Sequence, residues 1–425
     1  MDNECVRQGR EESGYFARQP VFDVSKKVWG FEILYRKTGD AVSAQFSDSD
    51  SATLSVIAGL SQSDEAALPR GKKILINFGE KSILAEAPLA FPPTNVIIEI
   101  PEFLSLDEPF LAALTRLRGL GYELAVDDFE GGPGKKPLHE LASLFIVDVL
   151  GRREEDLRAL AGKAREFGAG RMLAAKKVES EEAFLASERA GFDLFQGYYF
   201  QRPELIAGKT ITSGEMSRLR LLRMLQTPDP DFTALAQAIK SDPAISLKLL
   251  TFLNCPLFAF TTKVTTIERA LTLLGWKQLK NWLRVIIFTD AAPTEKIQEL
   301  AYASVQRAKF FENAAVAQAF SPLECERRFL LGLFSLLDAM MGVPMEEILD
   351  KIGLDEELKL ALCGGVNSLS PWLSAAQAFE AGDWAGLDEI FGRMRLEPMA
   401  AAKWYSNSLE WANVVFRYGM EPEAA

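Results

Sequence analysis

The chain has 425 residues, of which 48% are hydrophobic and 25% charged, which is typical of a globular protein and excludes a disordered or fibrous one. Its length exceeds the size at which a single core stops growing, so we expect two domains. The formal net charge of −12 disfavours a nucleic-acid partner. The sequence has no signal-type N-terminus and no apolar run near the roughly 20 residues that cross a bilayer, so we predict a cytoplasmic protein without membrane contact.

Histidine and cysteine are scarce. His139 is the only histidine, which removes metal centres built on several imidazoles and leaves little basis for a Ser-His-Asp triad. Its proline-rich surroundings predict a surface turn. The four cysteines have no Cys-x-x-Cys spacing, so we expect buried free thiols and neither disulfides nor a zinc site. These cysteines are Cys5, Cys255, Cys325 and Cys363.

Short apolar runs alternate with helix-like segments from about residue 15 to 200. Eight runs are predicted as strands: Arg18–Val24, Val28–Tyr35, Ile74–Phe78, Val96–Ile100, Glu123–Asp128, Leu144–Val149, Arg171–Ala175 and Asp193–Tyr198. Helical patterns over Ser105–Gly119, Arg153–Gly168 and Ser180–Ala190 give the βα alternation of a parallel barrel. Only three residues separate the first two strands, which therefore form an antiparallel hairpin. The prediction is a modified TIM barrel of α/β class.

Strand-like runs end after Pro203, and a stretch rich in Gly, Thr and Ser follows. Beyond it, apolar residues such as Leu235, Ile239 and Leu247 recur with helical spacing, which predicts an all-α domain. The predicted organisation is an N-terminal extension (1–14), a barrel (15–205), a linker (206–213), a helical domain (214–415) and a C-terminal tail (416–425).

Polar side chains stand at the carboxyl ends of the predicted strands, where barrel enzymes carry their chemistry. Carboxylate and amide oxygens at one barrel mouth suit Mg²⁺ or Mn²⁺. A polar residue that merely caps a strand end explains any single one of them, but their agreement over five strands favours a common site. The residues are Glu32 with Arg36, Asn77, Glu99, Asp127 with Asp128, and Gln196.

These residues resemble the EAL family of cyclic di-GMP phosphodiesterases, which use two metals and an attacking water. The resemblance covers about residues 15–205. It includes Gln19-Pro20-Val21, Phe31-Glu32-Ile33-Leu34-Tyr35-Arg36, Ile76-Asn77-Phe78, Ile98-Glu99-Ile100, Asp127-Asp128-Phe129 and Phe195-Gln196-Gly197. It implies metal ligands at Glu32, Asn77, Glu99, Asp127 and Asp128. It also implies contacts to the dinucleotide from Gln19, Arg36, Glu179 and Gln196.

The chain departs from the family at two catalytic positions. Ile146 stands where the family has a lysine that positions or deprotonates the attacking water, and loss of such a group costs on the order of 10² to 10⁴ in rate. Lys176 stands where the family has a glutamate. Its ammonium group would repel a metal, and we expect it to pair with Glu99 or Asp127. A Gly/Pro turn over residues 130–137 also replaces the family's ordered loop.

The C-terminal half resembles the HDOD domain, a helical output module related to HD-type metal phosphohydrolases. Stretches that carry the resemblance include Ile239–Ser246, Ile267–Ala270 and Gly332–Ala339, and coverage is about residues 213–410. No histidine follows His139, so this half lacks the ligands of that enzyme. Asp338 is accordingly predicted to be a structural, hydrogen-bonding aspartate.

Three functions follow as hypotheses. The first is a catalytically degenerate EAL-HDOD adaptor that requires no cofactor and binds an unidentified signalling protein through its helical domain. The second is a weakly active phosphodiesterase in which Mg²⁺ or Mn²⁺ still binds. The third is a receptor that binds cyclic di-GMP without hydrolysing it. A homodimer is compatible with each of them.

Overall fold

The computed structural model describes residues 14–37, 71–168, 170–202, 213–226, 232–240, 243–254, 279–281, 283–287 and 294–420, together with positions 264, 266, 269 and 276. Eight strands close into a barrel in the order β1 to β8. Their bounds are β1 Gly14–Asp23, β2 Val28–Lys37, β3 Lys73–Asn77, β4 Val96–Pro101, β5 Glu123–Asp127, β6 Leu144–Asp148, β7 Met172–Lys176 and β8 Leu194–Phe195. Each strand overlaps its predicted run, and β8 is the shortest.

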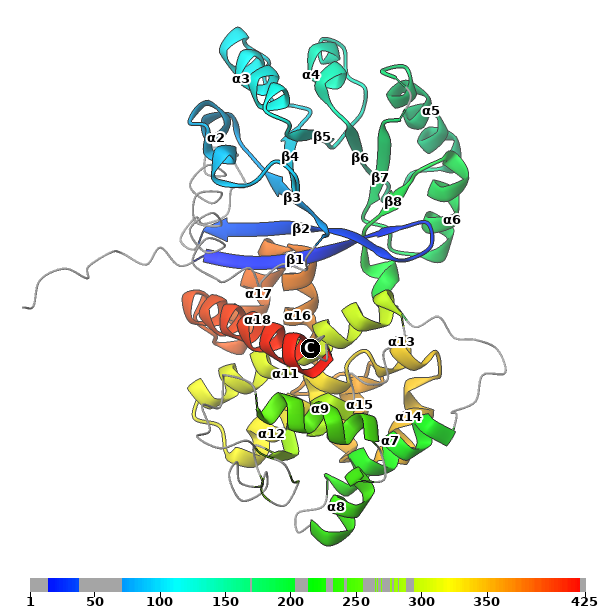
Figure 1. Ribbon diagram of the computed structural model, residues 1–425, viewed down its shortest axis with the longest axis vertical. Helices are drawn as coiled ribbons and strands as arrows, with labels where there is room; N and C mark the ends of the chain where they lie inside the picture. The colour runs from blue at the N-terminus through cyan, green and yellow to red at the C-terminus, as the bar shows by residue number, and fades with distance from the viewer. Residues whose placement is uncertain are drawn as a thin grey trace, which may run out of the picture.

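Strand β1 runs antiparallel to β2 and also to β8, whereas each pair from β2–β3 to β7–β8 is parallel. The predicted modified TIM barrel with an antiparallel first hairpin is therefore confirmed. Short helices follow the parallel strands and cover the outside of the barrel (Figure 1). They are α2 Glu80–Leu84, η2 Ala87–Ala90, α3 Glu108–Gly119, α4 Lys136–Leu141, α5 Glu154–Arg165, α6 Glu181–Ala190 and η3 Tyr198–Gln201.

Local sequence explains where these helices begin and end. Helix α3 starts after Asp107, whose carboxylate accepts a hydrogen bond from the backbone N–H of Phe110, and α6 starts after Ser180 in the same way. Helix α6 ends at Gly191, which has a φ of 90° that glycine adopts without strain. The alternation of helices and strands thus follows from capping residues that the sequence supplies.

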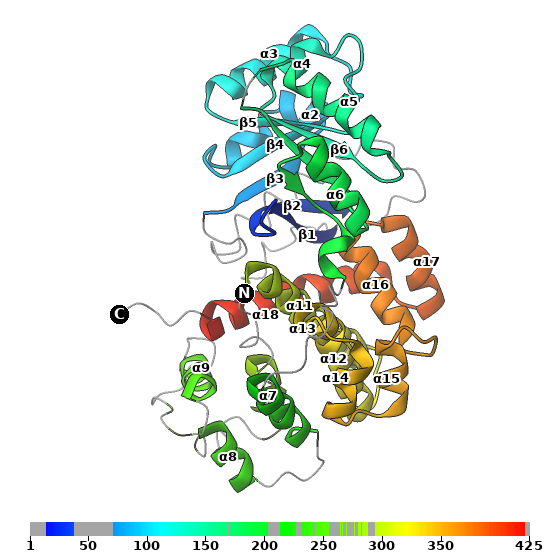
Figure 2. The ribbon, with the colours of Figure 1, turned by 90° about the vertical axis from the view of Figure 1, so that its right-hand side faces the viewer.

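The second half of the described chain is helical, as predicted. The two halves lie end to end, and the β1–β2 hairpin lies between the rest of the barrel and helices α16 and α18 (Figures 1 and 2). The helices are α7 Ser213–Met224, α8 Phe232–Lys240, α9 Pro243–Leu253, α11 Glu295–Ala317, α12 Pro322–Phe334, α13 Leu337–Met341, α14 Met345–Ile352, α15 Glu356–Leu362, α16 Ser370–Ala381, α17 Trp384–Met394 and α18 Pro398–Met420.

Among the described residues, the apolar core has three parts. One fills the space between the barrel wall and its outer helices, and a second forms a layer inside the barrel. The third lies in the helical half but includes Ala17 of β1, so the first strand packs on both halves. Most of the predicted linker, residues 206–212, lies outside the described residues, and α7 begins at Ser213. Helix α18 continues to Met420, beyond the predicted domain end at residue 415.

Candidate functional site

The barrel interior is built from two layers of inward-facing side chains. Because side chains alternate along a strand, residues two apart share a face. Leu75, Ile97, Ala125, Ile146 and Ala174 belong to the apolar interior layer. Two residues further along the same strands stand Asn77, Glu99, Asp127, Asp148 and Lys176, and Gln196 holds the same place after Leu194 of β8. The polar layer therefore lies at the carboxyl ends of the parallel strands, directly above the apolar layer.

Hydrogen bonds join the predicted site residues of β2, β3 and β4. Asn77 Nδ2 donates to Glu99 Oε2 at 2.7 Å and to Glu32 Oε1 at 3.2 Å. On the other side of Glu32, Gln196 Nε2 donates to Glu32 Oε2 at 2.7 Å and to Gln19 Oε1 at 2.8 Å. Three of the five predicted metal ligands and two of the predicted dinucleotide contacts are therefore parts of one network.

Lys176 reaches the paired aspartates from β7. Its Nζ lies 2.7 Å from Asp127 Oδ1 and 2.6 Å from Asp128 Oδ1. Asp128 follows directly after β5 and has a φ of 50°, a left-handed conformation that aspartate tolerates better than most residues. Of the two predicted partners of Lys176, the structure places Asp127 in contact, and Asp128 is a partner that the sequence did not predict.

The carboxylates in this layer raise one another's pKa. Burial, followed by the charge of Asp127, raises the pKa of Glu32 to about 7. Burial and the charges of Glu32 and Asp127 raise the pKa of Glu99, which is 1% exposed, well above its usual value. For Lys176, burial alone would lower the pKa, but Asp127 and Asp128 outweigh it and raise it. Lys176 is therefore a permanent cation that compensates part of a crowded set of acids.

The residues of the barrel mouth do not fit a two-metal hydrolytic site in this arrangement. Lys176 Nζ contacts one carboxylate oxygen of Asp127 and one of Asp128, and its positive charge would repel a divalent cation bound to these oxygens. In the part of the chain that the structure describes, no group of three His, Cys, Asp or Glu side chains has an arrangement that could hold a metal ion. Ile146, 4% exposed, packs in the apolar layer and has no group that can take a proton.

The structure does not bring the remaining predicted site residues, Arg36 and Glu179, into the described hydrogen-bond network of the barrel mouth. The side chain of Arg36 lies outside the described residues, although its backbone belongs to β2. Glu179 is exposed beyond the end of β7, and no described hydrogen bond joins it to the network. The inward-facing Asp148 pairs with Lys177, whose Nζ lies 2.6 Å from Asp148 Oδ2. Burial would raise the pKa of Asp148, but the hydrogen bonds from Lys177 and from the backbone N–H of Leu150, together with the lysine charges, outweigh it and lower that pKa.

The prediction that His139 is a surface residue is wrong. Its side chain lies in α4, is 2% exposed and has Nε2 2.6 Å from Glu102 Oε1. The rings of Phe129 and Phe167 flank it with centroids 5.2 and 4.9 Å away. Pro137, in the first helical turn, was the available signal, since proline at that position indicates a helix start and not only a turn.

Glu102 was not singled out from the sequence, yet it is the buried partner of His139. Its carboxylate also accepts hydrogen bonds from the backbone N–H groups of Glu130 and Gly132, at 2.8 and 3.1 Å. Burial would raise the pKa of Glu102, but these donors and His139 lower it. The Gly/Pro turn that replaces the family's ordered loop is therefore held to the barrel by Glu102.

Two predictions concern the helical half and the cysteines. Cys325 is buried as expected, but Cys363 is exposed, which corrects the prediction that every thiol is buried; Cys5 and Cys255 lie outside the described residues. Asp338 lies in the first turn of α13, where its Oδ1 accepts a hydrogen bond from the backbone N–H of Ala339 at 2.8 Å. This contact fits a structural role.

Comparison with known proteins agrees with the two-part architecture. Residues 215–364 match the model of the HDOD domain. The chain is 28% identical over 377 residues to the cyclic di-GMP phosphodiesterase CdgJ of Vibrio cholerae, which covers 88% of this chain and 87% of the relative. It is 29% identical over 408 residues to the uncharacterized protein YuxH of Bacillus subtilis, with coverage of 94% and 98%.

Solved structures with similarity to this chain include BlrP1 of Klebsiella pneumoniae, in a complex with calcium and cyclic di-GMP. The two are 23% identical with a TM-score of 0.38, over 47% of this chain and 57% of BlrP1. The Bacillus subtilis YkuI protein, with an EAL domain, in complex with cyclic di-GMP and calcium, is 16% identical with a TM-score of 0.37, over 55% of this chain and 73% of YkuI.

A closed barrel with an antiparallel first hairpin is followed by a helical region that contains a matched HDOD domain. This two-part architecture, and the similarity of most of the chain to a protein named a cyclic di-GMP phosphodiesterase, support the prediction of an EAL-like barrel followed by an HDOD domain. Among the described residues, no helix combines the length and the apolar character that a membrane crossing needs.

Proposed function

We propose that this chain is a signalling adaptor whose barrel does not hydrolyse cyclic di-GMP and whose helical domain binds a partner protein. The observation that carries the proposal is the contact of Lys176 Nζ with Asp127 at 2.7 Å and with Asp128 at 2.6 Å. In the family that the sequence resembles, a glutamate stands at this position and the aspartates hold metal. Lys176 gives the aspartates a cation that belongs to the chain itself.

Electrostatics supports a barrel mouth that is stable without a divalent ion. Glu32, Glu99 and Asp127 all have raised pKa values, so each carboxylate would be easier to ionise beside a cation. A hydrolytic metal site satisfies that need with Mg²⁺ or Mn²⁺. Here the ammonium group of Lys176 compensates part of the negative charge, and protonation of Glu32 or Glu99 would remove more of it.

Loss of the proton-handling residue points in the same direction. Ile146 is buried in the apolar layer beside Ala174, its register partner on β7. A hydrocarbon side chain neither orients a water molecule nor accepts its proton. The proposed loss of catalysis therefore has two causes, one electrostatic at Lys176 and one chemical at Ile146.

Within the adaptor proposal, the barrel either binds cyclic di-GMP as a receptor or serves as a ligand-blind scaffold. Gln19 and Gln196, which the resemblance assigns to dinucleotide contact, lie together beside Glu32. Isothermal calorimetry with the dinucleotide, with and without Mn²⁺, separates the two. Binding that persists in a metal chelator supports the receptor, whereas a flat titration at high protein concentration eliminates it.

A second candidate function is weak, metal-dependent hydrolysis of cyclic di-GMP. It is favoured by the name of the Vibrio cholerae relative, a cyclic di-GMP phosphodiesterase, and by the convergence of Glu32, Asn77 and Glu99 in one network. Under this alternative, Lys176 would have to leave Asp127 when the metal binds.

One enzymatic experiment decides between the two candidates. Purified protein is assayed with Mg²⁺ and with Mn²⁺, beside the double variant Ile146→Lys and Lys176→Glu, which restores both family residues. The adaptor proposal expects no turnover in the natural chain and measurable turnover in the double variant. Robust hydrolysis by the natural chain, abolished by Glu99→Gln, would overturn it and establish the second candidate.

A further inference from the structure

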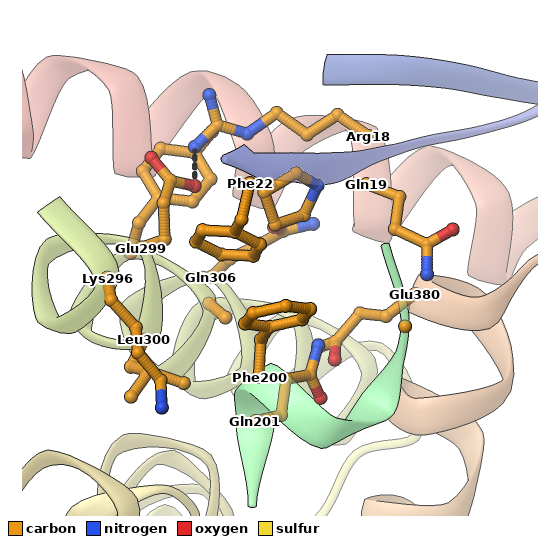
Figure 3. A pocket seen from close by; sticks show the side chains of 14 residues that line it. Arg18, Gln19, Phe22, Phe200, Gln201, Lys296, Glu299, Leu300, Gln306 and Glu380 are labelled. Atoms are coloured by element: carbon orange, nitrogen blue, oxygen red, sulfur yellow. Dashed lines mark hydrogen bonds and ion pairs between the residues drawn. The ribbon is translucent and has the colours of Figure 1, made fainter. Parts of the chain in front are cut away.

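Strand β1 has adjacent residues that contact different domains. Gln19 faces the barrel interior, where its Oε1 accepts a hydrogen bond from Gln196 Nε2 at 2.8 Å. Arg18 points the other way, toward the helical domain, and its Nη2 donates to Glu299 Oε2 of α11 at 2.9 Å (Figure 3). Because side chains alternate along a strand, a shift of β1 that alters one contact also moves the other.

Arg18 is held tightly on its helical-domain side. Its guanidinium carbon lies 3.7 Å from the ring centroid of Tyr302 on α11 and 4.4 Å from that of Phe31 on β2. The side chain is 8% exposed, so its charge depends on Glu299 and on these two rings for compensation. A cation enclosed in this way makes the position of β1 sensitive to the position of α11.

A second connection starts from the same hydrogen bond and runs through η3. Gly197 follows Gln196 directly and has a φ of 153°. A Cβ at position 197 would stand 2.3 Å from the backbone O of Val178, so this position allows only glycine. At the end of η3, Gln201 Oε1 accepts a hydrogen bond from Arg307 Nη2 of α11 at 3.2 Å. The residue that donates to Glu32 is therefore tied through one short helix to the helical domain.

A movement of η3 would disturb the hydrogen bonds of Arg307, because its guanidinium group is buried and donates to several partners. It is 2% exposed, and its Nε and Nη2 donate to the two carboxylate oxygens of Glu380 on α16 at 2.7 and 2.6 Å. Its Nη1 donates to Ser335 Oγ at 3.0 Å. The ion pair with Glu380 fixes the Arg307 guanidinium between α11 and α16, so Gln201, which carries no charge, contacts a group whose position depends on both helices.

The interface between the two connections is incompletely filled. Arg18, Gln19, Phe22, Phe200, Gln201, Glu299, Gln306 and Glu380 are among the residues that line a cavity of about 40 Å³ (Figure 3). The rings of Phe22 and Phe200 stack with centroids 4.3 Å apart. The free volume beside them leaves room for a second arrangement of α11 against β1.

We propose that β1 and the Gln196–Gln201 segment transmit the state of the barrel mouth to α11 and α16, so that the helical domain responds to what occupies the barrel. The Gln196–Gln19 hydrogen bond is the point from which both connections start. Where the occupant is cyclic di-GMP, this inference rests on the receptor form of the proposed function. The mechanical link itself requires no ligand and is tested without one.

The ligand-free test compares two changes in the same barrel mouth by hydrogen–deuterium exchange of the full chain. Gln196→Ala removes the bonds to Gln19 and Glu32 and lies on the proposed connection. Lys176→Met removes the bonds to Asp127 and Asp128 and does not touch β1. Gln19→Ala breaks the first bond from its other side and serves as a second variant if Gln196→Ala does not fold.

The expected result is a severalfold faster exchange of backbone amides in residues 295–307 of α11 for Gln196→Ala and Gln19→Ala. For Lys176→Met, exchange rises in β5 and β7 while α11 keeps its natural rate. In the reverse direction, Glu299→Gln is expected to accelerate exchange at residues 194–197, since coupling between two sites is reciprocal. Unchanged exchange in α11 for both glutamine variants, or equal acceleration by Lys176→Met, would overturn the proposal.

A ligand arm separates this inference from the proposed function. Cyclic di-GMP is added to the natural chain in the absence of metal, and calorimetry and α11 exchange are recorded on the same sample. Binding with a changed α11 rate supports both. Binding without any change in α11 sinks the transmission proposal and leaves the receptor intact. Absence of binding eliminates the receptor, and the variants alone then decide the link.

Discussion

Lys176 Nζ lies 2.7 Å from Asp127 Oδ1, in the polar layer that the barrel wall encloses. Asp127 is a predicted metal ligand, and Lys176 stands where the resembled family has a glutamate. The resemblance implies that a metal ion lies between the glutamate and the aspartate in the family. In this chain, the ammonium group of Lys176 contacts Asp127 directly instead. Because both side chains are less than one-fifth exposed, solvent screens the contact only weakly.

Replacement of Lys176 by methionine is expected to destabilise the barrel by about 3 kcal/mol at neutral pH, since it leaves Asp127 without a partner beside Glu32 and Glu99. Lys177→Met is the matched control. Lys177 is 55% exposed and pairs with Asp148, so its loss should cost at most about 1 kcal/mol. Urea unfolding followed by far-ultraviolet circular dichroism measures both. Equal losses would show that the Lys176 contact is no stronger than a surface pair.

Lys176→Glu is expected to create a site for a divalent cation, since it adds an acid to Asp127 and Glu99 and removes the competing ammonium group. Thermal unfolding with 1 mM Mn²⁺ should then show a higher Tm than without it, by several degrees. The natural chain and a Lys177→Glu control should show no such rise. An equal rise in the natural chain would indicate that the metal displaces Lys176.

The raised pKa of Glu32 predicts a specific dependence of stability on pH. The pKa of Glu32 in the folded state, about 7, lies above its ordinary value of 4.5, so its favourable contribution is complete below pH 4.5 and is lost as the pH rises through 7. Glu32→Gln should therefore gain stability relative to the natural chain between pH 5 and 8, on the order of 3 kcal/mol. Urea titrations at both pH values test this, with the exposed Glu182→Gln as control. A pH-independent difference would contradict the assigned shift.

The buried pair of Glu102 and His139 predicts the opposite dependence. Because the pKa of Glu102 is lowered, its contribution is present above pH 4.5 and is lost as the pH falls through the folded-state value. His139→Leu removes a donor and should cost about 2 kcal/mol at pH 7, with a smaller cost in acid. His139→Gln keeps a donor and should lose less. Identical losses for leucine and glutamine would show that packing against Phe129 and Phe167 matters more than the hydrogen bond.

The barrel was predictable because its signals are local. Apolar runs with period two and helices with clear start residues gave each strand to within a few residues, and the antiparallel hairpin followed from the three residues between β1 and β2. The polar layer was predictable for the same reason, since Asn77 and Asp127 each end a strand and Glu99 lies near the end of β4. The candidate site thus came from positions at strand ends and from the resemblance to the EAL family, and not from knowledge of long-range contacts.

The rest depended on contacts between distant segments. Glu102 and His139 are 37 residues apart and meet only because α4 packs on the barrel, so neither residue carries a pattern that announces the pair. The choice of Asp128 as a second partner of Lys176 depends on a left-handed backbone at that position, which the sequence does not specify. The hydrogen bonds from Arg18 to Glu299 and from Arg307 to Gln201 join the two domains, and no periodic pattern in the sequence indicates either of them.

The shortness of β8 has a consequence for how the protein comes apart. Leu194 and Phe195 are its only residues, and they pair with just two positions of β1 on one side and two of β7 on the other. Because β8 pairs over so few positions on both sides, we expect the barrel to open first at this strand. Helix η3, which follows β8, hydrogen-bonds to the helical half through Tyr198 and Gln201, and these contacts oppose that opening. An isolated barrel would expose the unpaired edges of β1 and β7 and would tend to aggregate.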